Sequence, residues 1–296
     1  PILKNVSSFK TSRNTHLAAT GHENRQQRDD LNQIYISPSR KLTQIYNIGA
    51  MFDHLSQEYR IHRLQPSAAG TSFIVANERR VYYNARDTRD IILYDLREKR
   101  ELARRELPDA NYDNVTPYVF ELESDIDLER DLATNSIWAI YTTEENDGNI
   151  VLTQLNELTL KIENTYKTNL SKNILENGFV ICGTFYGVDE DGEISCSFDT
   201  NNNQENSNLK GTGLNLRPES QKWDWQFVSL NFNLKDQSLN GWTDQGEAIR
   251  YVLEFKQLEP EKKDPEINLV PQENPIIIIT ENAEKINKIE SPTIVI

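Results

Sequence analysis

Two carboxylates stand two positions apart in the segment Ser124-Asp125-Ile126-Asp127. On a strand, residues with this spacing project from the same face, so Asp125 and Asp127 would lie side by side. If both were buried without partners, they would bind a cation, pair with a base or take up a proton. The alternative is a turn in which both aspartates are solvated, and the spacing alone favours that turn.

Two further pairs carry oxygen atoms that suit a hard cation. Asn177 offers a side-chain oxygen and Gly178 a closely approachable backbone carbonyl, and both precede an apolar strand. Leu230 and Asn231 form the second pair, within another apolar segment. The alternatives are a plain turn before a strand for the first pair and ordinary strand residues for the second.

Signatures of enzymes are scarce. The sequence has no serine elbow, no HExxH helix and no glycine-rich phosphate loop, and its four histidines lack metal-binding spacing. We therefore predict a non-enzymatic protein, with a carbohydrate-active enzyme that uses paired carboxylates as the alternative. The net charge of −14 argues against a nucleic-acid partner. No apolar run approaches the roughly 18 residues of a membrane-spanning helix, so we expect no membrane insertion.

Short strands are the elements that must position these residues. The strongest strand patterns cover residues 33–36, 71–75, 80–83, 91–94, 136–141, 149–152, 179–182 and 251–255. Turn signals between strands are Asp147-Gly148, Asp191-Gly192, Asn240-Gly241 and Gln245-Gly246. Many short strands without alternating helices are typical of a sandwich, barrel or propeller. Repeating units of about 50 residues suit four-stranded propeller blades, and predict about five of them.

The sequence changes character near residue 258. We expect a propeller domain over residues 1–258 and an extended tail, rich in Pro, Glu and Ile, over residues 259–296. The aliphatic runs 276–279 and 293–296 are suited to adding a strand to the sheet edge of another subunit. This would make the chain part of a homo- or hetero-oligomer through residues 260–296. The alternative is that the tail packs on its own propeller.

Cysteines and sequons indicate the cellular compartment. The two cysteines, Cys182 and Cys196, exclude a disulfide scaffold and a four-cysteine zinc site. They would not lie directly opposite each other in the expected hairpin, so we expect no bond between them. N-glycosylation sequons begin at Asn5, Asn114 and Asn169. The sequence starts without Met or a signal peptide, as expected of a processed, secreted chain.

Four segments together carry a resemblance to a known family. They are Leu102-Ala103-Arg104-Arg105-Glu106-Leu107-Pro108 with the following Tyr112 and Pro117-Tyr118, Ser124-Asp125-Ile126-Asp127-Leu128, residues 137–151, and residues 177–186. On these motifs the sequence resembles the olfactomedin-domain family from about residue 1 to residue 256, most strongly over residues 70–190. The resemblance implies a secreted, five-bladed β-propeller without known catalysis, which contacts other proteins in the extracellular matrix or at cell surfaces.

The resemblance also implies a calcium ion, often with a companion sodium ion, in the central channel. Its ligands would be Asp127, the Asn177 side chain, the carbonyls of Gly178 and Leu230, and Asn231. Position 231 is usually an aspartate in the family, so Asn231 removes a charge and should weaken calcium binding. Sodium or water could then occupy the site, or the ammonium of a cavity lysine, at position 172, could stand in for the metal.

One further departure concerns Cys182. It matches the family cysteine that bonds to one near the N-terminus, and this sequence has no cysteine there. We predict an extracellular protein-interaction module. The alternatives are a structural subunit of an extracellular assembly, joined through its tail, and a carbohydrate-active propeller enzyme.

Overall fold

The computed structural model describes residues 2–13, 25–28, 34–37, 42–48, 59–77, 79–119, 124–217, 225–234, 237–244 and 247–256. The predicted tail and the predicted turn at Gln245-Gly246 lie outside these residues. Within them the regular structure is β-strand, apart from two short 3-10 helices, Glu144–Asn146 and Lys172–Ile174. The expected all-β fold is confirmed.

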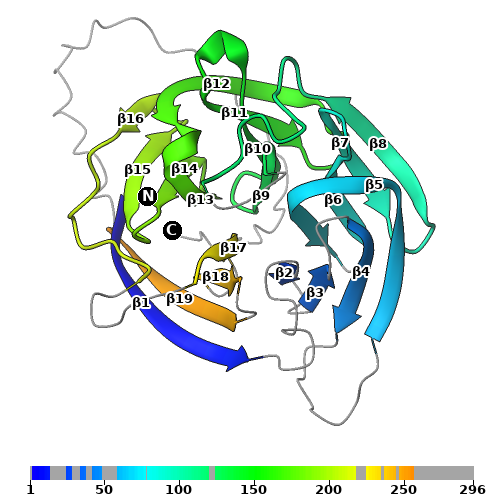
Figure 1. Cartoon of the computed structure of the whole chain (residues 1–296), viewed down its shortest axis with the longest axis horizontal. Helices are drawn as coiled ribbons and strands as arrows, with labels where there is room; N and C mark the ends of the chain where they lie inside the picture. Colours follow the sequence, from blue (N-terminus) through cyan, green and yellow to red (C-terminus); the bar gives the residue numbers. More distant parts are fainter. Residues whose placement is uncertain are drawn as a thin grey trace, which may run out of the picture.

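Antiparallel sheets stand around a common centre and make a β-propeller (Figure 1). The first sheet contains β2 (Arg25–Arg28), β3 (Ile34–Ser37), β4 (Leu42–Ile48), β5 (Tyr59–Ala76), β6 (Arg80–Ala85), β7 (Asp90–Asp95) and β8 (Arg100–Glu106). The second contains β9 (Asp127–Asp131), β10 (Ser136–Thr142), β11 (Asn149–Asn156) and β12 (Ile162–Ser171). The third contains β13 (Leu175–Ile181), β14 (Thr184–Asp189), β15 (Ile194–Asp199) and β16 (Gln204–Asn206). The last contains β17 (Phe227–Asn233), β18 (Ser238–Thr243), β19 (Glu247–Lys256) and β1 (Ile2–Arg13).

The seven-stranded sheet differs from the other three, which have four strands each. Its long strand β5 changes partner along its length: residues 59–63 pair with β4, residues 69 and 73–76 pair with β6, and Ala68 between them pairs with both. The described strands thus form four sheets, and the division into five four-stranded blades stays a prediction.

The N-terminal strand closes the ring. β1 pairs with β19 from Ile2 opposite Lys256 to Arg13 opposite Glu247, so the first strand completes the sheet formed by the last three. A backbone hydrogen-bond ladder therefore holds the two ends of the domain together.

Apolar side chains fill the spaces between neighbouring sheets. Tyr82 and Leu93 of the first sheet pack in one cluster with Leu128 and Ile137 of the second. A second cluster joins the second and third sheets, and a third joins the third and last sheets. Removal of this apolar surface from water, worth about 25 cal/mol per Å², holds the sheets against one another. The inner strands near the centre carry buried polar residues.

The predicted turn at Asn240-Gly241 is wrong. Both residues lie inside β18, where Gly241 stands opposite Leu230 of β17. A Cβ atom on Gly241 would lie 2.8 Å from the Phe227 ring, so the glycine serves close packing and not a turn. The predicted turns at Asp147-Gly148 and Asp191-Gly192 are confirmed, with φ of 73° at Gly148 and 77° at Gly192.

Substitution of Gly241 by alanine should lower the free energy of unfolding by about 1–3 kcal/mol, because the added methyl group overpacks against Phe227. Urea unfolding measures the change. Asn240→Ala, at the preceding, partly exposed position, is the control and should shift stability by less than about 0.5 kcal/mol. Wild-type stability of Gly241→Ala would contradict the close-packing role.

Candidate functional site

The predicted cation ligands lie on three strands that meet at the centre. β9, β13 and β17 are the strands of their sheets nearest the centre in Figure 1, and each contacts the other two. Asp127 begins β9, Asn177 and Gly178 lie on β13, and Leu230 and Asn231 lie on β17. The topology therefore gathers elements that are far apart in the sequence.

Asp127 is the buried carboxylate of this centre, with 5% of its surface exposed. One carboxylate oxygen, Oδ2, accepts a hydrogen bond from the Tyr118 hydroxyl at 3.0 Å, and Oδ1 accepts one from the Leu128 N–H at 2.9 Å. Burial raises the pKa of Asp127, and the nearby charge of Lys172 and these hydrogen bonds oppose that rise. An ionised Asp127 therefore depends on positive charge close by.

The β13 ligands lie where the packing leaves no spare room. Asn177 is buried, and its Oδ1 accepts a hydrogen bond from the Gly178 N–H at 2.9 Å. A Cβ atom on Gly178 would lie 2.5 Å from the Phe185 ring and 3.3 Å from the Tyr118 hydroxyl. Only glycine fits there, which brings the β13 backbone next to the residue that hydrogen-bonds Asp127.

The β17 ligands differ in how they could contribute. Leu230 is 1% exposed and its side chain belongs to the apolar core, so only its backbone carbonyl can serve as a polar ligand. Asn231 is partly buried and stands opposite Asn240 of β18. β17 thus offers a neutral carbonyl oxygen and a neutral amide oxygen, and no carboxylate.

Lys172 is fully buried beside this centre. Its ammonium Nζ donates hydrogen bonds to the carbonyls of Thr116 at 3.0 Å and Asp125 at 3.1 Å, and also to that of Ser124. It lies 4.2 Å from the centroid of the Tyr118 ring. Lys172 therefore ties the segment before β9 to the inner face of the ring, while its charge favours ionised Asp127.

Asp125 does not stand beside Asp127 on a strand, as the spacing suggested it could. β9 begins at Asp127, and the carboxylate of Asp125 accepts hydrogen bonds from the backbone N–H groups of Asn114 at 2.7 Å and Thr116 at 2.6 Å. Its role is to hold the preceding loop, so it leaves Asp127 as the carboxylate of this motif that faces the centre.

Glu129 is a buried carboxylate that the sequence analysis missed. It is 2% exposed and follows Asp127 by two residues on β9. Burial, and then the charge of Asp127, raise the pKa of Glu129 well above its usual value. The signal was the alternation of the strand itself, which places residues 127, 129 and 131 on one face.

Any cation at this centre would take a mixed set of oxygen ligands. Within the described ranges, no three His, Cys, Asp or Glu side chains gather in a metal-binding arrangement. Asp127 would provide a carboxylate, while Asn177, Asn231 and the strand carbonyls would provide neutral oxygens. Such a set suits a hard cation of the calcium type.

A buried ion pair holds β13 next to the centre. Arg217 donates to Glu176 at 2.5 Å and to the Trp225 carbonyl at 2.9 Å, and the Phe227 N–H also donates to Glu176. Burial raises the pKa of Glu176 to about 7, against the lowering effect of Arg217. Because Glu176 precedes Asn177, this pair fixes the β13 backbone at the position of the predicted ligand.

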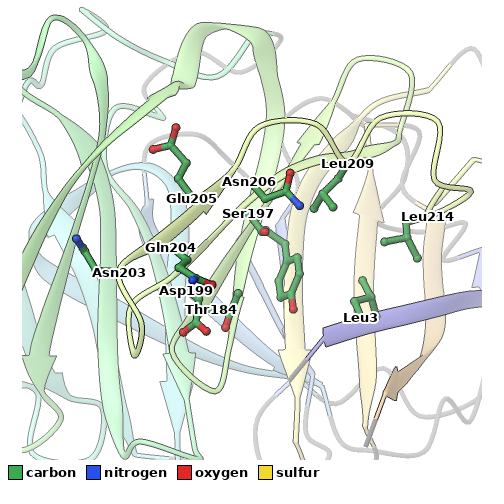
Figure 2. Close-up of a pocket in the computed structure, with 11 residues that line it drawn as sticks. Leu3, Thr184, Ser197, Asp199, Asn203, Gln204, Glu205, Asn206, Leu209 and Leu214 are labelled. Atoms are coloured by element: carbon green, nitrogen blue, oxygen red, sulfur yellow. The ribbon is translucent and has the colours of Figure 1, made fainter. Parts of the chain in front are cut away.

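A separate pocket lies at the side of the ring. It has a volume of about 620 Å³ and is lined by residues of β14, β15, β16 and β1 (Figure 2). Leu3, Tyr186 and Leu214 supply apolar lining, and Asp199 and Glu205 supply carboxylates. The pocket therefore combines an apolar surface with negative charge.

Neutral groups supply the hydrogen bonds to both pocket carboxylates. Asp199 accepts from the Asn201 N–H at 2.9 Å and from the Asn202 side-chain amide at 2.8 Å. Glu205 accepts from the Asn169 N–H at 2.8 Å. Since none of these donors carries charge, the pocket keeps a net negative charge.

Comparison with known proteins assigns the chain to a family. The sequence profile of the olfactomedin-like domain matches residues 2–258. The chain belongs to the olfactomedin domain family. The match ends close to the end of β19, so the olfactomedin domain corresponds to the ring of sheets described above.

The olfactomedin domain has relatives in larger proteins. Adhesion G protein-coupled receptor L1 of Mus musculus is 35% identical over 212 residues, which make up 67% of this chain and 13% of the receptor. Myocilin of Bos taurus is 34% identical over 219 residues, which make up 70% of this chain and 42% of myocilin. The chain thus spans less than half the length of either relative.

The olfactomedin domain exposes two of its three predicted glycosylation sites. Asn114 and Asn169 are exposed, whereas the side chain of Asn5 lies outside what the structure describes. Cys182 and Cys196 are both free thiols. In the described part of the chain, no helix has the length and apolar character needed to cross a membrane.

Lys172→Met should destabilise the olfactomedin domain by about 3–5 kcal/mol, because it leaves three buried carbonyls and the Asp127 carboxylate without a cation. Adding Asp127→Asn should recover part of this loss, since the remaining group is then neutral. Urea unfolding in excess chelator measures the free energies of the wild type, both single variants and the double variant. Strictly additive effects would contradict the coupling. Lys161→Met, at an exposed position, is the control for loss of a lysine.

Proposed function

We propose that this chain is a non-enzymatic, extracellular protein-interaction module of the olfactomedin type, which acts in the matrix or at cell surfaces. The observation that carries the proposal is the family match over residues 2–258. One relative is named an adhesion G protein-coupled receptor, and we extend an adhesive role to this chain. A closed ring of sheets suits that role, because it presents rigid loops and edges to a partner.

The lateral pocket is the contact surface that we assign to this function. Its carboxylates, Asp199 and Glu205, are held by neutral donors and would attract a basic segment of an extracellular protein. Its apolar lining, including Tyr186 and Leu214, would cover the aliphatic part of that segment. The overall charge of −14 would add long-range attraction for a basic partner.

Charge reversal in the pocket tests this assignment. The domain, secreted from mammalian cells, is immobilised and tested against a panel of purified extracellular receptor domains at several salt concentrations. We expect saturable binding to at least one member, with an association rate that Asp199→Lys and Glu205→Lys lower and make less dependent on salt. Glu163→Lys, an exposed reversal on β12, should leave the rate nearly unchanged. Binding that the pocket variants do not alter would contradict the assignment.

We further propose that the ring has five blades of four strands. The seven-stranded sheet supports this division, because the two halves of β5 pair with different neighbours. The first half would complete a blade with β2, β3 and β4, and the second half would begin a blade with β6, β7 and β8. With the three four-stranded sheets, this makes five blades around the centre.

The central site, in our proposal, binds calcium, with sodium as a companion or substitute. The residues fit this ion: Asp127 supplies a buried carboxylate, Asn177 and Asn231 supply amide oxygens, and Gly178 and Leu230 supply carbonyls. When bound, the ion would join three inner strands that no covalent link connects. Its role is therefore to stabilise the fold.

Calcium should raise the melting temperature of the wild-type domain relative to excess EGTA. At a concentration 100 times Kd the expected stabilisation is about 2.7 kcal/mol, a shift of roughly 5 °C or more. Differential scanning calorimetry measures both states. Asp127→Asn removes the carboxylate that begins β9 and should abolish the shift. Equal melting temperatures of the wild type with calcium and with EGTA would rule out the site.

Two further features belong to the proposed secreted protein. Asn5, Asn114 and Asn169 would carry N-linked glycans, for which Asn114 and Asn169 have the required exposure. Association through residues 260–296, which would make the chain a structural subunit of an assembly, stays a prediction from the sequence.

A further inference from the structure

We propose that Glu129 is a ligand of the central cation and restores the carboxylate that the β17 position, Asn231, does not provide. This inference rests on the proposed calcium site. It adds a residue to the ligand set that the family resemblance implies, and it places the second carboxylate on β9 instead of β17.

The register of β9 directs Glu129 to the same side as Asp127. Leu128 packs in the apolar cluster between the first and second sheets, and Arg130 pairs with Glu157 at 2.8 Å. The alternate residues therefore face away from that cluster. Asp131 confirms where they point, because its Oδ2 accepts a hydrogen bond at 2.7 Å from the Gly183 N–H, just beyond β13. Glu129 lies between Asp127 and Asp131 on this face, towards the strand that carries Asn177.

The charge of Glu129 has no balancing partner in the described chain. The other two buried glutamates, Glu157 and Glu176, each pair with an arginine. Glu129, by contrast, is 2% exposed and forms no ion pair among the described residues. A buried carboxylate in this situation takes up a proton or binds a cation.

The charges at the centre favour a divalent ion. Of the two carboxylates, Asp127 lies near the ammonium of Lys172, and Glu129 lies near Asp127. Three backbone carbonyls already accept hydrogen bonds from Lys172, so it cannot approach Glu129 without releasing them. A calcium ion between the carboxylates would compensate the remaining negative charge, and affinity for calcium rises with the number of charged ligands.

Glu129→Gln tests the proposal, because it keeps the shape of the side chain and removes its charge. Isothermal titration with calcium chloride should show at least about a tenfold weaker affinity than the wild type. Glu129→Gln combined with Asn231→Asp should regain most of the lost affinity, since the second carboxylate then comes from β17.

The melting temperature supplies a second readout, in which the effect of Glu129→Gln depends on whether calcium is present. In EGTA, Glu129→Gln should melt at a higher temperature than the wild type, because a neutral amide is easier to bury than a carboxylate. In calcium, its rise in melting temperature should be smaller than that of the wild type. A residue with a purely structural role would lower stability in both conditions.

Glu157→Gln is the matched control, since it removes the charge of another buried glutamate, one that pairs with Arg130. It should lower stability and leave calcium affinity unchanged. If the wild type binds calcium and Glu129→Gln binds it equally well, the role of Glu129 is overturned. The proposed calcium site itself would then remain supported. Absence of calcium binding by the wild type would overturn both.

Discussion

The need to satisfy buried polar groups at the centre of the ring governs the rest of this structure. Inner strands converge there with their carbonyls, amides and carboxylates, and the apolar clusters between the sheets offer these groups no partners. Lys172 meets part of the need by donating to three carbonyls and favouring ionised Asp127. Tyr118 links the same groups, because its ring lies under the ammonium and its hydroxyl donates to Asp127. The arrangement of the inner strands follows from these contacts.

The centre and the lateral pocket have different roles in the proposed function. In the proposed function, buried charge at the centre would stabilise the ring, whereas the partly buried Asp199 and the exposed Glu205 would attract partners. The two sites lie on different parts of the third sheet: β13 contributes to the centre, and β14, β15 and β16 contribute to the pocket. Contact surfaces can therefore vary at the outer strands while the inner strands keep their ligands.

Much of the fold could be predicted from the sequence, because strand patterns and turn signals act locally. The pairs β6–β7 and β10–β11 stand where the pattern placed them. The turn predicted at Asn240-Gly241 is wrong because that dipeptide is common in turns. The need for glycine at this position comes instead from the Phe227 ring on the neighbouring strand, which leaves no room for a Cβ atom. Within the site, the motif identified Asp127, but its spacing could not show that β9 begins there. The partner of Asp127 on the strand is thus the residue two positions after it, Glu129, and not Asp125, two positions before.

Closure of the ring by β1 and β19 has a consequence for synthesis of the protein. The pairing of Ile2 with Lys256 joins the first described residue to the last, so these contacts have the largest sequence separation among the described residues. A ribosome delivers β19 after the other described strands, and until then the edge of β1 that pairs with β19 stays open. Contacts of such separation slow folding, and open edges invite pairing with other chains.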